Sequence, residues 1–302
     1  MKVSSKLNLI LRLTGLTQEK LAQRLGVSFV TLNSWINNRS IPHAKKQRNI
    51  DEIYVLYTGG QSIPKDVLEA KKQVIFEKAK NYTNVLKTIQ ENSDIYDQFL
   101  LSLTYNTNSI EGSTLTEHET AAVLFQNLSL KNKTLIEQLE VKNHQAAFEY
   151  MLGSKEINED FILMLHTKLM NGIHSDAGIY RSHGVRILGS RVVTANYLKV
   201  PELMKNIIED IHLEKKDVIA HVASIHSQFE KIHPFADGNG RIGRLLMHAM
   251  LFQYNIPPAL IKNENKALYY AYLSKSQLKE DKTLLEDFFC EAVLESYKML
   301  KR

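Results

Sequence analysis

Twelve consecutive residues, from His233 to Arg244, combine a histidine, a carboxylate, a glycine-flanked asparagine and two arginines. A histidine of near-neutral pKa can remove the proton of a hydroxyl group, and arginine binds phosphate oxygens through paired hydrogen bonds. A magnesium ion on nucleotide phosphates usually needs one or two protein carboxylates, and Asp237 is the one carboxylate of this stretch. The residue types therefore predict a phosphate-handling site, with His233 as base, Asp237 as magnesium ligand, and Arg241 and Arg244 on a di- or triphosphate.

Two helices must position this stretch. Upstream, apolar residues recur at helical spacing from Val218 to Phe229, and Pro234 ends the pattern, so we expect His233 at the mouth of a turn. Downstream, a second apolar helix is predicted, and the Gly238-Asn239-Gly240 turn lies at its N-terminus, where free N–H groups attract anions. A spacing of three residues places Arg241 and Arg244 on one face of that helix.

A simpler interpretation treats the stretch as a helix stop, a glycine turn and two surface arginines, because short glycine turns are common. The complete string argues against it. The string resembles the Fic-family signature, His-Pro-Phe-x-Asp/Glu-Gly-Asn-Gly-Arg-x-x-Arg, at every fixed position. In most enzymes of that family, AMP is transferred from ATP to a serine, threonine or tyrosine hydroxyl of a protein.

The resemblance implies a role for each position of the signature. His233 would deprotonate the target hydroxyl, and Asp237 would hold a magnesium ion that bridges the α- and β-phosphates of ATP. The phosphates themselves would be bound by the rest of the signature: Gly238, Asn239 and Gly240 at the α-phosphate, Arg241 at the β-phosphate and Arg244 at the γ-phosphate. Mg²⁺ and ATP are thus the implied cofactor and co-substrate.

A second informative segment lies upstream, at Thr107-Asn-Ser-Ile-Glu111-Gly112. It resembles the inhibitory helix of many Fic proteins, Ser/Thr-x-x-x-Glu-Gly/Asn, which implies that Glu111 pairs with Arg244 and competes with the γ-phosphate. In some relatives the same glutamate orients a water that removes AMP, so Glu111 is also a candidate base for de-adenylylation. The alternative is a chance helix end with a glycine cap.

The resemblance extends over roughly residues 85 to 300. Within it, β-branched residues around Gly189-Ser190 indicate a short hairpin from Val185 to Val193. By resemblance this is the flap, on which a target protein docks as an added strand. The segment after it lacks the prolines often found there, which leaves the docking register open. Tyr270 stands where relatives place an adenine-contacting tyrosine, with a place in the core as the alternative.

The N-terminal region is more basic than the rest of the chain. Residues 1–60 hold five lysines and four arginines against three acidic residues, whereas the whole chain carries +5. Thr17 and Ser28 are candidate helix caps on either side of a turn at Gly26, which resembles the helix-turn-helix of phage repressors. That resemblance implies DNA binding, with Phe29, Val30 and Asn33 facing the bases of the major groove. The residues that would approach phosphates are Gln18, Asn37, Arg39, Lys45 and Lys46. The alternative is a helical module that docks on protein.

Composition indicates a cytoplasmic protein. The chain has 302 residues, of which 44% are hydrophobic and 24% charged, enough for one sizeable core and a small domain. The single cysteine, Cys290, excludes an intrachain disulfide and suggests a reducing compartment. The apolar run from Leu7 to Leu13 is interrupted by Asn8 and Arg12, so we expect neither a secretion signal nor a membrane span. The spacing of His221, His226 and His233 does not suit a zinc site.

The sequence therefore predicts a mainly α fold: an N-terminal helix-turn-helix bundle plus a Fic-type helical domain with a short β-hairpin flap. The expected divisions are a module at 1–60, a linker and connecting region at 61–92, and a catalytic domain at 93–302 with the inhibitory helix around 105–112. In the connecting region, apolar positions from Val67 to Leu86 indicate one long helix.

The predicted function is that of an autoinhibited protein adenylyltransferase. Three alternatives stay open: an enzyme that chiefly removes AMP, a transferase for another group such as UMP or phosphate, and a DNA-bound regulator whose Fic domain senses nucleotide. Whether the chain forms a homo-oligomer is also left open by the sequence.

Overall fold

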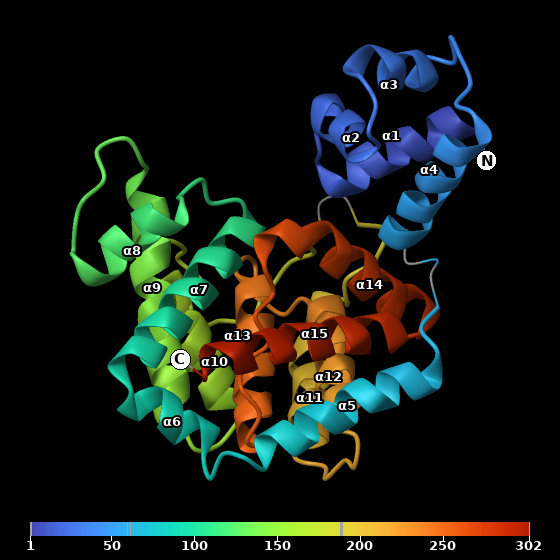
Figure 1. Ribbon diagram of the computed structural model, residues 1–302. Helices are drawn as coiled ribbons and strands as arrows, with labels where there is room; N and C mark the ends of the chain where they lie inside the picture. The colour runs from blue at the N-terminus through green and yellow to red at the C-terminus, as the bar shows by residue number, and fades with distance from the viewer. Residues whose placement is uncertain (1, 59, 61, 188–189, 302) are drawn as a thin grey trace. The chain divides into compact units, whose positions relative to one another are not determined.

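The computed structural model describes residues 2–58, 60, 62–187 and 190–301. The described residues are mainly helical, as predicted (Figure 1). They form two compact units, which are described separately. The first contains residues 1–63 and 264–284, and the second contains residues 64–263 and 285–302. The first unit thus combines the N-terminal region with a segment from near the C-terminus.

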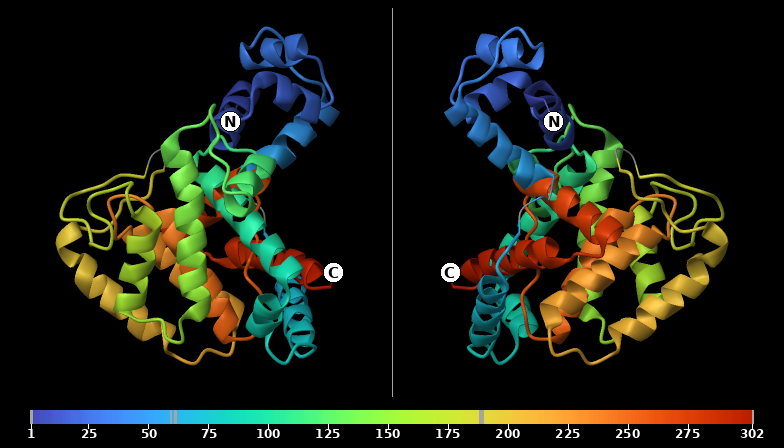
Figure 2. Two further views of the ribbon diagram at one scale, coloured as in Figure 1. Left: turned by 90° about the vertical axis from the view of Figure 1, so that its left-hand side faces the viewer. Right: turned by 90° about the vertical axis from the view of Figure 1, so that its right-hand side faces the viewer.

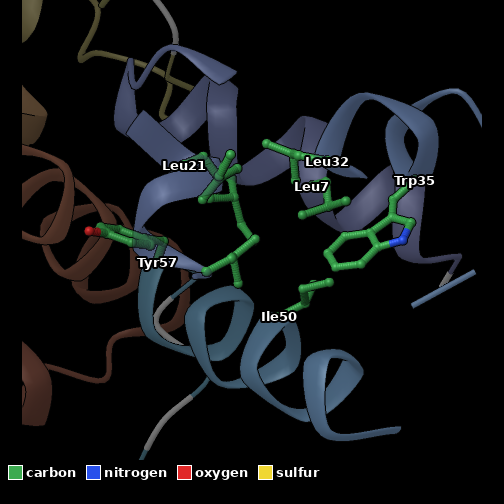
Figure 3. Close-up of a cluster of buried hydrophobic side chains, with 9 residues drawn as sticks. Leu7, Leu21, Leu32, Trp35, Ile50 and Tyr57 are labelled. Carbon is green, nitrogen blue, oxygen red and sulfur yellow. The ribbon is translucent and has the colours of Figure 1, made fainter. Parts of the chain in front are cut away.

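The first unit is built from five helices around one apolar core. They are α1 (Val3–Thr14), α2 (Gln18–Arg24), α3 (Phe29–Ile36), α4 (Ala44–Tyr57) and α14 (Lys266–Lys279). Figure 3 shows Leu7, Leu21, Leu32, Trp35 and Ile50 converging from α1 to α4. All five are buried, and Ala267 and Leu268 of α14 pack against the same cluster.

The helix caps predicted for this unit are confirmed. The Thr17 hydroxyl accepts a hydrogen bond from the Lys20 N–H at the start of α2, and the Ser28 hydroxyl accepts one from the Thr31 N–H at the start of α3. Between them Gly26 has φ +62°, a left-handed conformation that favours glycine. These local signals therefore set the turn between α2 and α3.

The second unit holds the remaining helices. In chain order they are α5 (Lys65–Ala79), α6 (Val85–Glu91), α7 (Ser93–Glu111), α8 (Glu117–Phe125), α9 (Leu135–Gly153), α10 (Glu159–Met170), α11 (Val200–Ile211), α12 (Val218–Ile232), α13 (Asn239–Gln253) and α15 (Thr283–Met299), whose first two residues fall in the first unit. Every residue from Arg241 to Leu251 of α13 is buried. Figure 1 shows α13 in the middle of this unit, with α10 and α12 beside it.

The connecting region differs from the prediction, since two helices replace the expected single one. The helix α5 ends at Ala79, and Asn84 starts α6 by accepting a hydrogen bond from the Lys87 N–H at 2.9 Å. The side-chain amide of Asn255 donates to the carbonyls of Ala79 and Tyr82 at 3.3 and 2.8 Å, so the break in the helix is held from α13's C-terminal end. The apolar pattern alone carried no signal for this long-range contact.

The stretch between α10 and α11 runs as loops (Figure 2), followed by the short 3₁₀ helix η1 (Tyr197–Lys199). The predicted hairpin lies here. No strand occurs among the described residues 185–187 and 190–193, so a β-hairpin is not shown; Leu188 and Gly189, at the predicted tip, lie outside the described residues. In the described part of the chain, no helix is long and apolar enough to cross a membrane.

Candidate active site

His233 directly follows α12 and adopts a left-handed backbone conformation, with φ 55° and ψ 64°. Its ring Nδ1 lies 3.2 Å from the carbonyl oxygen of Glu230. Because a carbonyl can only accept, Nδ1 must carry the proton, which leaves the lone pair on Nε2. Burial, followed by the charge of Arg181, holds the pKa of His233 below its usual value. The ring is therefore neutral near pH 7, with the free nitrogen that a general base requires.

The loop after His233 is closed by the side chain of Asn239. Its Oδ1 accepts from the Phe235 N–H and its Nδ2 donates to the Phe235 carbonyl, both at 2.8 Å. Phe235 is fully buried, and the ring of His166 stacks on it at 3.7 Å. His166 also fixes the loop through Nε2, which lies 3.1 Å from the Asp237 carbonyl oxygen. Both polar ends of the Asn239 side chain thus bind the loop itself, which leaves anion binding to backbone N–H groups.

Gly238 and Asp237 lie at the start of α13. Gly238 has φ +77°, and a Cβ there would collide with the sulfur of Met170. The Asp237 side chain is exposed, and its Oδ1 accepts from the Gly238 N–H at 2.6 Å. The N–H groups in the first turn of α13 have no partner within the helix, and the positive end of the helix dipole points the same way. A site for an anion and a carboxylate that can bind a cation therefore lie at the same end of α13.

Arg244, one turn into α13, is 3% exposed and is held by α7. Its Nη2 lies 2.5 Å from Oε1 of Glu111, and its Nε donates to the Thr107 hydroxyl at 2.7 Å. Glu111 is the last residue of α7, and Gly112 caps that helix with φ 109°. The structure therefore brings Thr107, Glu111 and Gly112 together with Arg244, although they lie more than a hundred residues away in the chain.

Arg241, the other arginine of the signature, pairs with a carboxylate of α9. Its Nη1 lies 2.7 Å from Oε1 of Glu140, and the side chain of Arg241 is 3% exposed. Its Nε has no hydrogen-bond partner among the described residues. Nothing in the sequence analysis singled out Glu140, because the pairing joins two helices that are far apart in the chain.

Two glycines of α13 leave room for carboxylates. A Cβ at Gly240 would collide with Oε1 of Glu111, and a Cβ at Gly243 would collide with Oε1 of Glu230. Glu230 is buried on α12, and burial raises the pKa of its carboxyl group to about 8, against a lowering influence of Arg244. Glu111 thus approaches Arg244 as a partner in an ion pair, whereas Glu230 is mainly protonated near pH 7.

The remaining predicted site residues lie in the first unit. Tyr270 is on α14, 39% exposed, with its ring 5.2 Å from that of Tyr269. On α3, Phe29 and Val30 are 44% and 74% exposed. Asn33 accepts at its Oδ1 from the Asn37 side chain and donates to Gln18 Oε1 at 3.2 Å.

The basic residues of that unit differ from one another. Arg39 and Lys45 are exposed, whereas Lys46 donates to the carbonyls of Leu25 and Gly26 at 2.6 and 3.2 Å. Lys46 therefore closes the end of α2 and has less freedom to reach a phosphate. In the residues that the structure describes, no group of histidine, cysteine or acidic side chains is arranged to hold a metal ion by itself.

Comparisons with known proteins confirm the resemblance to the Fic family and the presence of a helix-turn-helix. Residues 156–251 match the Fic/DOC family, and residues 9–46 match the helix-turn-helix family. The chain therefore contains a Fic/DOC-family segment that includes the whole signature, and a separate helix-turn-helix segment.

Several curated relatives carry the name protein adenylyltransferase, and two of them illustrate the match. The Fic protein of Nematostella vectensis is 32% identical over 185 residues, which is 57% of this chain and 42% of the relative. The fic-1 protein of Caenorhabditis elegans is 33% identical over 184 residues, 58% of this chain and 36% of the relative. The chain thus spans less than half the length of these relatives.

Solved structures show the same fold. The C. elegans Fic-1 structure superposes with a TM-score of 0.67 at 21% identity, covering 94% of this chain and 84% of that one. A Fic family protein from Desulfovibrio desulfuricans G20 gives 0.66 at 26% identity, covering 79% and 74%. The helical arrangement around the signature is therefore that of Fic proteins.

Proposed function

We propose that this protein transfers AMP from ATP to a serine, threonine or tyrosine hydroxyl of a target protein or of itself. The observation that carries the proposal is the grouping of His233 with its free Nε2, the N-terminus of α13, and Arg241 and Arg244 at that end of the helix. This grouping supplies a base beside a site for a polyphosphate. The relatives named protein adenylyltransferase support the same reaction.

In this reaction the target hydroxyl oxygen forms a bond to the α-phosphorus of ATP. The bond from that phosphorus to the bridging oxygen of the β-phosphate breaks, and pyrophosphate leaves. His233 takes the hydroxyl proton at Nε2. The N–H groups of Asn239 and Gly240 bind the α-phosphate oxygens, and Gly238 lets that phosphate approach the backbone closely. Arg241 binds the β-phosphate and Arg244 the γ-phosphate. Catalysis then comes from positioning and charge stabilisation, as is usual in phosphoryl-type transfer.

The residues present also fit a magnesium ion bound together with ATP. Asp237 is exposed beside the anion-binding end of α13, and its carboxylate has further lone pairs besides the one that Gly238 occupies. One such carboxylate suffices when phosphates supply other ligands. The ion, when bound, would neutralise charge on the phosphates.

We further propose that Glu111 keeps the enzyme inactive at rest. Its carboxylate lies on the guanidinium that would bind the γ-phosphate, so the two anions compete for Arg244. Thr107 supports this state by accepting from Arg244 Nε. The same position suits Glu111 for orienting a water in the reverse direction, so AMP removal is one outcome of the test.

The test measures transfer of α-labelled AMP from ATP with Mg²⁺ to the protein itself and to a lysate. The variants are Glu111→Gly and Glu111→Gly/His233→Ala, with Glu156→Gly as control because Glu156 is an exposed carboxylate in a loop. We expect label with Glu111→Gly, and none with the double variant. If no variant transfers label although ATP binds, the proposal is wrong. Loss of bound label that depends on Glu111 would instead favour AMP removal.

We also propose that the first unit binds DNA through the start of α3. Phe29 and Val30 are large apolar residues exposed there, and the match to the helix-turn-helix family covers this helix. The basic residues of 1–60 provide attraction to phosphates. Since apolar side chains form no hydrogen bonds to bases, we expect weak sequence preference.

Fluorescence anisotropy with a labelled duplex of mixed sequence tests this at about 50 and 200 mM salt. Arg39→Ala/Lys45→Ala should weaken binding several-fold, and Lys155→Ala, an exposed residue of the second unit, should not. Absence of binding at the lower salt concentration would favour a module that docks on protein.

A further inference from the structure

Arg181 has an environment unlike that of the phosphate-binding arginines. It is 3% exposed, and among the described residues its guanidinium donates to four backbone carbonyls. Nε donates to the carbonyl of His233 and Nη1 to that of His183, both at 2.7 Å. Nη2 donates to Ala195 at 2.6 Å and to Ile232 at 3.2 Å. One guanidinium therefore satisfies four carbonyl groups.

These carbonyls come from two places in the chain. Ile232 and His233 end α12, and carbonyls at a helix end have no partner within the helix. His183 and Ala195 stand at the two ends of the loop 183–195, which contains the predicted flap. Arg181 thus joins both ends of the flap loop to the backbone of the candidate base.

Two further hydrogen bonds strengthen this junction. The Ala195 N–H donates to the carbonyl of Lys231 at 3.3 Å, and the Thr194 hydroxyl donates to that of Val185 at 2.7 Å. The first ties the end of the loop to the last turn of α12, and the second ties one limb of the loop to the other. The base and the roots of the flap loop are therefore connected through short hydrogen-bonded links.

The chemistry of this position requires arginine in particular. The guanidinium offers five N–H donors in a rigid plane, whereas lysine offers three donors around a single point. A cation at the C-terminal end of α12 also interacts favourably with the helix dipole. Lysine would keep the charge, but its single ammonium group could not reach the four carbonyls that lie around the edge of the guanidinium plane.

We propose that Arg181 is a positioning residue that holds the target hydroxyl and the base in register. This inference rests on the proposed function, in which the target segment lies along the flap loop. A target held by that loop is then placed relative to His233 through Arg181. The guanidinium of Arg181 donates to His183, Ala195, Ile232 and His233 and not to Asp237 of the proposed nucleotide site, so nucleotide binding should not depend on it.

The test uses self-labelling with α-labelled AMP in the Glu111→Gly protein, with ATP affinity measured separately by calorimetry. Arg181→Lys should lower the labelling rate at least tenfold, because small misplacements of reacting groups cost one to two orders of magnitude. ATP affinity should stay within twofold. Arg48→Lys, which changes an exposed arginine on α4 outside the proposed catalytic and docking sites, is the control and should change neither quantity.

Two further measurements separate positioning from a general loss of folding. Arg181→Met removes the cation beside His233, so the His233 pKa followed by NMR should rise, whereas Arg181→Lys should leave it nearly unchanged. Thr194→Val removes the link between the loop limbs while leaving Arg181 intact, and should lower labelling less than Arg181→Lys does.

Several results would overturn the inference. One is Arg181→Lys labelling within twofold of its parent, and another is a parallel loss of labelling and ATP affinity. A Thr194→Val protein with unchanged labelling would also contradict it, should Arg181→Lys fail to fold. If the Glu111→Gly parent transfers no label at all, the proposed function itself fails, and this inference fails with it.

Discussion

The base end and the phosphate end of the site both depend on buried arginines, but the partners differ. Arg181, Arg241 and Arg244 are each 2–3% exposed. At the base end, Arg181 donates to four carbonyls; at the phosphate end, Arg241 and Arg244 pair with Glu140 and Glu111. A phosphate can replace a carboxylate on a guanidinium because both are anions of similar geometry. A phosphate cannot replace the carbonyls that Arg181 binds, because those carbonyls would then lose their hydrogen-bond donor.

The two sets of partners differ in whether they can be exchanged during turnover. Under the proposed function, the carboxylates of Glu140 and Glu111 hold Arg241 and Arg244 at rest and give way to the phosphates of ATP. The carbonyls at the base end belong to the fold itself. We therefore expect regulation to act on Arg241 and Arg244, and substitutions at the base end to remove activity without altering regulation.

The largest effect is expected at the base. In the Glu111→Gly protein, His233→Ala should lower AMP transfer about 10²- to 10⁴-fold, the usual contribution of a general base. Binding of ATP should stay nearly unchanged, because the phosphates are held by α13. Label transfer and calorimetry measure the two quantities. A variant that keeps more than a tenth of the activity would mean that the two ends are not divided in this way.

Glu230 lies between the two ends, on α12 and against Gly243 of α13. Burial raises its pKa to about 8 in the folded protein, above the value of an exposed glutamate, so the folded state binds the extra proton. Stability supported by that proton is complete below the unfolded pKa of about 4.3, and it is lost as pH rises to about 8.

Glu230→Gln should therefore gain stability over the parent as pH rises through this window, by up to about 1.4 kcal/mol per pH unit. Urea unfolding of both proteins between pH 5 and about 8 measures the difference. If the free energies of unfolding of the two proteins change in parallel with pH, Glu230 is ionised in the folded protein and interacts with Arg244 as Glu111 does.

A substitution of Glu140 tests whether phosphate can replace the carboxylate that pairs with Arg241. Glu140→Gln keeps an acceptor near Arg241 but removes its negative charge, so we expect ATP to bind about tenfold more tightly. Calorimetry on the parent and the variant gives the comparison, with Glu149→Gln on the same helix as control. Weaker binding would mean that Glu140 orients Arg241 for the phosphate and does not compete with it.

The smallest effect is expected at Glu137, which anchors Thr114 in the segment after α7, the proposed inhibitory helix. Its Oε1 accepts from the N–H and the hydroxyl of Thr114 at 2.8 and 2.7 Å, and its Oε2 caps α9 at Thr134. The Thr114 backbone N–H, the main contributor, helps hold the pKa of Glu137 at about 2.

Glu137→Ala should cost about 1 kcal/mol of stability through the lost cap. In the protein that retains Glu111, this change should raise self-labelling a few-fold, because the segment after Glu111 loses its anchor at Thr114. Thermal unfolding and label transfer measure the two effects. An unchanged labelling rate at reduced stability would indicate that the inhibitory contact depends on Arg244 alone.

The local features of this site were accessible from the sequence. The end of α12 at His233, the start of α13 at Asn239 and the glycine cap of α7 at Gly112 each follow from neighbouring residues. The pairing of Glu111 with Arg244 came from the family resemblance, since composition and periodicity do not join positions so far apart.

The missed features depend on contacts between distant segments. The four carbonyls around Arg181, the pairing of Glu140 with Arg241 and the break between α5 and α6 all require knowledge of which elements meet. Asn239 stays a predicted phosphate ligand through its backbone N–H; the role of its side chain in closing the loop was not foreseen, because it depends on which buried peptide group needs a partner. Sequence patterns identify residue types, but they do not reveal which polar groups would otherwise be unsatisfied.

Gly240 carries a consequence for how this site can evolve. A single methyl group there would occupy the position that Oε1 of Glu111 now fills. Under the proposed function, two anions occupy that small volume in turn: the Glu111 carboxylate at rest, and a phosphate of ATP when the nucleotide binds. A side chain at position 240 would exclude both anions, so the absence of a Cβ there is needed for activity and for its inhibition alike.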